Sequence, residues 1–154
     1  MREQFKFLDL ETAWHTIASI IDVIREYYAA NDRSGLKATV AYLADATAAF
    51  VRFLKTRRPH RISLGAISDR ELWKDMGPGE ILATISYEAK IAGIIIDAKQ
   101  TLLKDVRSAS QKRLSVEINK MIRETKRRIA EAKEYIDRYW PGHWQADEHI
   151  SRWL

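Results

Sequence analysis

The 154-residue chain contains no cysteine, which excludes a disulfide-stabilised scaffold, a cysteine-ligated zinc or iron–sulfur site, and thiol catalysis. Long hydrophobic runs are also missing. The longest uncharged stretch, Thr12 to Ile21, has ten residues, and a membrane-spanning helix needs about 20. Asp9 and Glu11 interrupt the N-terminal segment, so we expect no secretory signal, no membrane span, and a cytoplasmic or virion location.

Motifs for common catalytic and cofactor sites are absent as well. The six glycines form neither a GxGxxG nor a GxxxxGK[ST] pattern, so no nucleotide-binding loop is predicted. The four histidines are scattered, and no Glu-x-x-His pair occurs of the kind that di-iron bundles carry. No GxSxG context marks a serine nucleophile. We therefore expect no metal ion and no cofactor, and we favour a role that is not enzymatic.

Helical periodicity dominates what the sequence does contain. Apolar residues recur at steps of three and four over four long segments and cover one face of each predicted helix. No useful length of chain alternates with the period of two that marks a strand. The predicted helices span about residues 10–30, 36–57, 78–106 and 109–140. This pattern predicts an all-α fold, specifically a four-helix bundle.

Local signals predict where these helices begin and end. Asp9 is the predicted N-cap of the first helix, and the polar residues 31–35 form the predicted turn after it. Ser108 and Gln111 form a capping-box pattern before the fourth helix. Pro141-Gly142 is expected to end that helix, because proline cannot continue it and glycine favours the turn.

The chain is expected to divide into a helical bundle, residues 1–142, and an amphipathic C-terminal tail, residues 143–154. A short extra helix, residues 69–76, is predicted in the long connection between the second and third helices. The tail is aromatic and too apolar to extend into water. Its side chains either fold back on the bundle or dock on a neighbouring subunit, and we expect self-association into a dimer or higher assembly. The residues assigned to self-association are Trp140, Trp144, Ile150 and Trp153.

The net charge of +5 is distributed unevenly. Residues 52–61 contain five cations and no acid, and residues 112–128 contain seven cations and two acids. These two segments together carry +10, so the remainder of the chain carries −5. A concentrated basic surface on an acidic remainder is typical of a protein that binds a polyanion. The alternative interpretation is that each segment is a solvated helix face.

Each basic segment has a structural role as well as a possible functional one. The cations in residues 52–61 interact favourably with the helix dipole at the end of the second predicted helix, although fewer cations would be enough for that. On the fourth helix, pairing of Lys120 with Glu117 and of Glu124 with Arg127 or Arg128 would neutralise part of the basic strip. Cations suit phosphate oxygens, and such contacts position a protein on nucleic acid without reading its sequence. The candidate nucleic-acid-binding residues are Arg52, Lys55, Arg57, Arg58, Arg61, Lys112, Lys120, Arg123 and Arg127.

Composition adds a further expectation. Asparagine and glutamine together number only six, and charged residues make up 31%, which suggests a source in a hot environment. In size, helicity and charge, the basic, cysteine-free chain resembles the coat proteins of filamentous archaeal viruses. The resemblance implies a subunit that dimerises, binds linear double-stranded DNA along its phosphates, and stacks into a helical virion. We therefore expect a structural nucleic-acid-binding protein, with double-stranded DNA as the favoured partner.

Arg138 and His143 support an enzymatic alternative. Their spacing resembles the R-x4–6-H signature of HEPN ribonucleases, which are helical bundles of similar size. The resemblance implies that Arg138 would bind the phosphate and His143 would perform acid–base catalysis at a dimer cleft. The simpler alternative pairs Arg138 with Glu134 and leaves His143 to cap the helix end. A third hypothesis is a helical adaptor that binds only protein through its Trp-rich tail.

Overall fold

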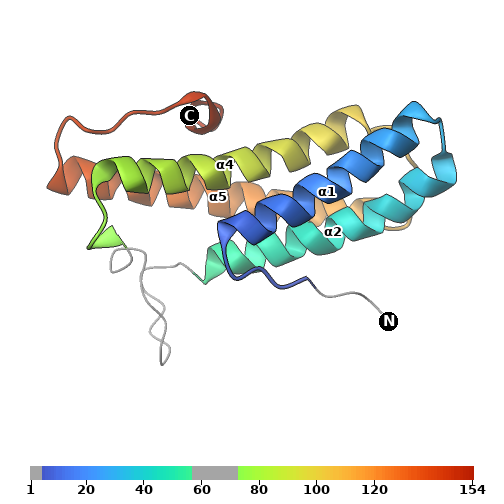
Figure 1. The fold of residues 1–154 in the computed structure, drawn as a ribbon, viewed down its shortest axis with the longest axis horizontal. Helices are drawn as coiled ribbons and strands as arrows, with labels where there is room; N and C mark the ends of the chain where they lie inside the picture. Colours follow the sequence, from blue (N-terminus) through green and yellow to red (C-terminus); the bar gives the residue numbers. More distant parts are fainter. Residues whose placement is uncertain (1–4, 57–72) are drawn as a thin grey trace.

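A computed structural model of the chain describes residues 5–56 and 73–154 (Figure 1). Over these residues the fold is all-α, with four long helices, one short helix and no strand. The four long helices are α1 (Leu10–Ala29), α2 (Arg33–Lys55), α4 (Pro78–Thr101) and α5 (Gln111–Tyr139). The short helix α6 (Glu148–Ser151) lies in the C-terminal tail. The predicted all-α helical bundle is confirmed.

The long helices form two antiparallel hairpins, α1–α2 and α4–α5 (Figure 1). Each helix packs against two others, because α1 and α5 both contact α2 and α4. The turn between α1 and α2 and the connection between α4 and α5 lie at the same end of the bundle, on the right of Figure 1. Segments that are far apart in the sequence therefore meet at this end.

The core follows from the apolar stripes of the helices. Ile17, Phe50 and Ile95, from three different helices, are fully buried in one cluster that α5 completes. A second buried cluster joins Trp73 to the start of α4, the end of α5 and the tail. Burial of such side chains contributes about 1.5–3 kcal/mol each, which makes the paired stripes the main source of stability.

The first turn of the bundle is tighter than the sequence predicted. Asp9 does cap α1, since its carboxylate accepts a hydrogen bond of 2.7 Å from the Thr12 backbone N–H. Asp32, inside the predicted turn, also acts as an N-cap and accepts from the Gly35 N–H at 3.0 Å. Helix α2 consequently begins at Arg33 rather than near Leu36, and the prediction of a turn over residues 31–35 was wrong for its second half.

The second connection is longer than predicted. Helix α4 ends at Thr101 instead of near Val106, and α5 begins at Gln111. The predicted capping box was wrong, because the Gln111 amide donates to the carbonyls of Leu103 (2.8 Å) and Val106 (2.7 Å) instead of its own helix. The carbonyls of Leu103 and Val106 lie beyond the end of α4 and have no donor within a helix, so the Gln111 side chain provides one. Residues 102–110 therefore form an ordered connection that positions side chains at the bundle end.

The C-terminal tail runs back along α4 from the end of α5, so that α6 lies over the middle of the bundle (Figure 1). Ile150 of α6 is only 1% exposed. Of the predicted extra helix 69–76, residues 69–72 lie outside the described part of the chain, and Trp73 is buried.

Candidate nucleic-acid interface

The structure separates the predicted phosphate-binding residues of α5 into two groups. Lys120 is paired with Glu117 at 3.2 Å between Nζ and Oε1. Arg127 is paired with Glu124 at 2.8 Å and with Glu131 at 3.0 Å. Burial disfavours the charged guanidinium of Arg127, but the hydrogen bonds and charges of the two glutamates outweigh it and raise its pKa. Ion pairs within the molecule therefore hold Lys120 and Arg127.

The other predicted cations differ from these two. Lys112 and Arg123 are exposed on α5, and neither forms an ion pair with any residue in the described part of the chain. Arg52 is exposed and donates one hydrogen bond, of 3.3 Å, to the Phe5 carbonyl. Lys55 is half-buried in the last turn of α2. The remaining three predicted residues, Arg57, Arg58 and Arg61, lie outside the described residues.

A larger group of cations gathers where the two hairpins turn. Two adjoining grooves lie there, of about 770 and 450 Å³, and they share Lys104, Val106 and Arg107. Asp105 is the only carboxylate among the described residues that line them. We call the cationic residues of these grooves the cationic end, and they are Arg33, Lys37, Lys99, Lys104, Arg107 and Lys112.

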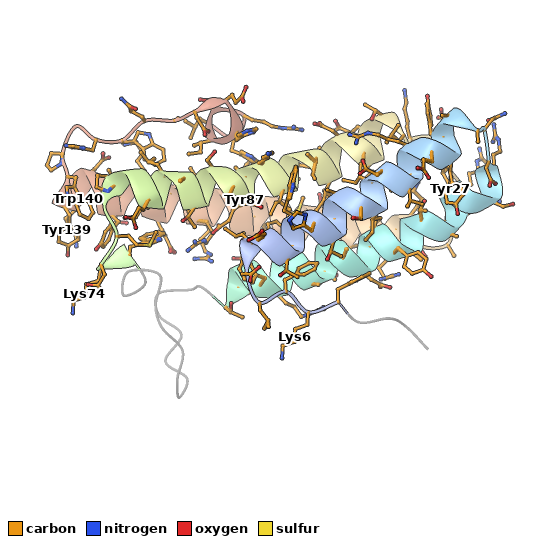
Figure 2. All side chains as sticks on the ribbon, in the orientation of Figure 1. Lys6, Tyr27, Lys74, Tyr87, Tyr139 and Trp140 are labelled. Atoms are coloured by element: carbon orange, nitrogen blue, oxygen red, sulfur yellow. The ribbon has the colours of Figure 1, made fainter. Side chains whose placement is uncertain are left out.

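The side chains of the cationic end are not committed to ion pairs. Lys99 is half-buried and the other five are exposed. None of the six forms an ion pair with another residue that the structure describes. Tyr27, labelled near this end in Figure 2, packs beside the turn, and Tyr139 and Trp140 mark the opposite end. These six cations thus gather at one end of an elongated molecule.

Helix electrostatics explain only part of this arrangement. Lys99 lies in the last turn of α4, where the helix dipole favours a cation, but Arg33 and Lys112 lie at helix N-termini. Arg33 lies in the first turn of α2 and Lys112 in the first turn of α5, and neither turn contains an acidic residue. A helix N-terminus carries a partial positive charge, so a cation there is unfavourable by about 0.3–1 kcal/mol. At α2 the N-cap carboxylate of Asp32 lies next to Arg33 in the sequence and offsets its charge, whereas α5 has Lys112 in its first turn and no side-chain cap. A bound anion would therefore be most favourable at the N-terminus of α5.

Sequence analysis identified only Lys112 of the cationic end. The six residues come from the start of α2, the end of α4, the connection and the start of α5, and no single stretch stands out as basic. Two sequence signals were present. The first turns of the second and fourth helices lack acids, and the segment 99–107 contains three cations and one acid.

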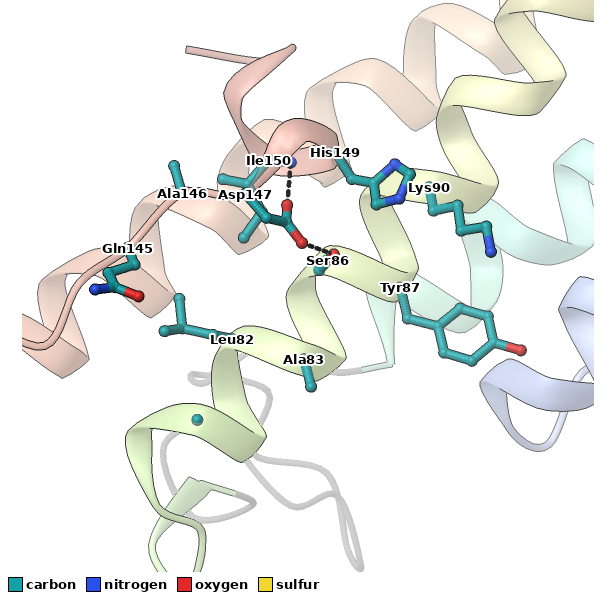
Figure 3. A pocket seen from close by; sticks show the side chains of 11 residues that line it. Leu82, Ala83, Ser86, Tyr87, Lys90, Gln145, Ala146, Asp147, His149 and Ile150 are labelled. Atoms are coloured by element: carbon teal, nitrogen blue, oxygen red, sulfur yellow. Dashed lines mark hydrogen bonds between the residues drawn. The ribbon is translucent and has the colours of Figure 1, made fainter.

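A third groove, of about 610 Å³, lies between α4 and the tail (Figure 3). The Ser86 hydroxyl donates to the Asp147 carboxylate, which also accepts from the Ile150 N–H at 2.9 Å. Burial favours the neutral acid, but these hydrogen bonds and the neighbouring His149 outweigh it and lower the pKa of Asp147. The pair attaches the tail to α4. No cluster suited to a metal ion occurs among the residues described.

The tail residues assigned to self-association pack within their own chain. Ile150 is buried, and Trp140, Trp144 and Trp153 are half-buried against the second core cluster. The tail therefore folds back on its own bundle, which is one of the two arrangements that the sequence left open. The three tryptophans keep part of their surface exposed, and self-association through these four residues stays a prediction.

The contact between Arg152 and Asp97 attaches the tail at a second point. The Arg152 guanidinium donates to both carboxylate oxygens of Asp97, at 3.1 and 2.9 Å. Gly93 provides the room for this contact, because a Cβ at that position would lie 3.1 Å from Arg152 Nη1. The tail is therefore held by polar contacts on both sides of Ile150.

Arg138 and His143, the residues of the ribonuclease alternative, lie at the end of α5. Arg138 Nη2 is 3.7 Å from Glu134 Oε1, as the simpler interpretation predicted. Both side chains of this pair are more than half exposed. The His143 backbone N–H donates to the Trp140 carbonyl at 3.0 Å, within the turn that ends the helix.

Comparisons with protein-family models, with curated proteins and with solved structures give no match to this chain. No helix within residues 5–56 or 73–154 combines the length and apolar character that crossing a bilayer requires. The geometry of the chain itself is therefore the basis for a functional proposal.

Proposed function

We propose that this protein is a structural nucleic-acid-binding protein that contacts the phosphate backbone without sequence specificity. The observation that carries the proposal is the cationic end, where six lysine and arginine side chains and one carboxylate line two adjoining grooves. Phosphates are the anions that such a surface suits, because lysine and arginine both donate charge-assisted hydrogen bonds to them.

The extent of the surface favours a polymer over a small anion. The two grooves share Lys104 and Arg107, so the cations form one continuous surface rather than a single enclosed site. Arg123 adds a further exposed cation on α5. A polyanion gains affinity with each phosphate it places on such a surface, because each contact releases counterions.

The specific form of the proposal is a DNA-packaging coat subunit that self-assembles on double-stranded DNA. The resemblance in size, helicity and charge to coat proteins of filamentous archaeal viruses supports it. The bundle is elongated (Figure 1), and the cationic end lies at one of its ends. Side-by-side stacking of such subunits along a polymer would present their cationic ends to the same strand.

Titration of a fluorescent duplex DNA across a salt series tests the proposal. We expect log affinity to fall linearly with log salt, with a slope that counts the phosphates contacted. The K104E/R107E double variant should bind at least about tenfold more weakly and lose about two units of that slope.

The matched control reverses charge at the opposite end of the molecule. Lys74 is exposed there, and K74E should leave the affinity within about twofold of the wild type. The absence of binding at low salt, or an equal loss in K74E and K104E/R107E, would overturn the proposal. A parallel R57E/R58E variant tests the predicted contribution of the segment 52–61.

A further inference from the structure

The larger groove of the cationic end contains more than cations. One wall comes from the α1–α2 turn and the start of α2, and the other comes from residues 101–107. Leu36, Leu102 and Val106 give it an apolar floor. Tyr28 also lines the groove, and its side chain is 54% exposed. An aromatic and apolar surface therefore lies directly beside four cationic side chains.

Packing does not explain why the ring of Tyr28 is there. The preceding residue, Tyr27, is half-buried against α2, where a Cβ on Gly35 would lie 2.5 Å from its ring. Tyr27 thus fixes the turn. Tyr28 forms no ring–ring contact with another aromatic residue in the part of the chain that the structure describes. Its exposed ring is available to a ligand.

The combination of a ring and cations indicates the class of ligand. Proteins that bind single-stranded nucleic acid combine a positively charged groove for the backbone with aromatic side chains on which bases stack. A purely ionic site for phosphates would not need a ring. The groove volume, about 770 Å³, is within the range of about 300–1,000 Å³ that small-ligand sites occupy.

We propose that this groove holds an unpaired nucleotide of the bound nucleic acid. The base stacks on Tyr28 over the apolar floor, and the flanking phosphates contact Lys104 and Arg107. The inference rests on the proposed function, because it uses the same cationic end. It adds a preference for strand ends and single-stranded segments over continuous duplex.

Three probes of equal duplex length test the inference: a blunt duplex, the same duplex with a short single-stranded overhang, and that overhang with its bases removed. The wild type should bind the complete overhang at least about fivefold more tightly than the abasic one, as expected from the stacking of one base. The abasic overhang keeps the phosphates, so this comparison isolates the base from the backbone.

Variants of Tyr28 then assign the effect to the ring. Y28A should bind the complete and abasic overhangs equally, and Y28F, which keeps the ring, should retain the preference. Y42A is the matched control, because Tyr42 is a similarly exposed tyrosine (48%) on α2 that does not line the groove. Since Tyr28 is largely exposed, removal of its ring leaves the core intact.

The outcomes separate this inference from the proposed function. Equal affinity of the wild type for complete and abasic overhangs, with K104E/R107E still impairing duplex binding, would overturn the inference and leave the proposed function intact. Absence of binding to all three probes at low salt would overturn both. An equal loss in Y28A and Y42A would also exclude the assignment to this groove.

Discussion

At the scale of single residues, the most unusual feature is a buried ion pair between Glu88 of α4 and Arg128 of α5. The guanidinium donates to both carboxylate oxygens, at 2.8 and 2.7 Å, and both side chains are 1% exposed. The Trp73 ring lies 5.3 Å from the guanidinium carbon, close enough for a cation–π contact. A bidentate pair of this kind restricts α4 and α5 to one register.

Removal of one side chain of the Glu88–Arg128 pair should lower the free energy of unfolding far more than removal of both. We expect R128M to lower the free energy of unfolding by about 3–5 kcal/mol, because Glu88 then remains buried without its bidentate partner. The double variant E88L/R128M should recover most of that loss, since it removes both buried charges. Urea unfolding of the wild type, E88L, R128M and the double variant measures the coupling. Additive effects of the two substitutions would contradict this prediction.

At the scale of elements, the tail depends on a few polar contacts around one buried isoleucine. Asp147 has two structural roles, because it caps α6 and accepts the Ser86 hydrogen bond from α4 (Figure 3). Its folded-state pKa is lowered, so the ionised form stabilises the docked tail. The contribution is present at pH values above the unfolded-state pKa of about 3.9 and disappears as the pH falls through the lower folded value.

Acid should therefore weaken tail docking in a defined window. We expect the wild type to unfold at a higher urea concentration than D147N from neutral pH down to about pH 5. The difference should shrink between about pH 4 and the folded pKa, because protonated aspartic acid loses its advantage over asparagine. A difference that is constant down to pH 2 would show that the carboxylate charge has no role in docking.

At the scale of the whole molecule, charge and shape are arranged along one axis. The cationic end lies where both hairpins turn, and the aromatic cluster with Trp140 lies at the other end (Figure 2). A cation in the first turn of a helix interacts unfavourably with the helix dipole at low salt, as Lys112 does in α5; at α2 the Asp32 cap offsets part of this effect for Arg33.

Acidic residues in place of Arg33 and Lys112 should stabilise the folded chain and weaken DNA binding. We expect R33E/K112E to raise the free energy of unfolding by roughly 0.6–2 kcal/mol at low ionic strength, because an acid at a helix N-terminus is favourable. The gain should shrink as salt screens the charges, and duplex affinity should fall. Thermal unfolding at low and high salt measures the first effect. A variant less stable than the wild type at low salt would contradict the prediction.

The sequence by itself determined the fold class. Apolar residues with helical spacing define four long helices, and local chemistry places several of their ends, as Asp9 does for α1 and Pro141 does for α5. These features depend on neighbours within about four residues, which a single sequence displays. The pairing of Arg138 with Glu134 and of Lys120 with Glu117 was predictable for the same reason.

The tertiary structure decided which charged side chains are exposed and which are buried in ion pairs. Arg128 belongs to a basic stretch of the sequence, yet it is buried because Glu88 of another helix lies opposite it. Arg33 and Arg107 lie in stretches of the sequence without a strong excess of positive charge. They line the same groove because both hairpins turn at one end of the bundle. Burial and long-range pairing depend on residues that are distant in the sequence, so only the packed bundle determines where the free positive charge lies.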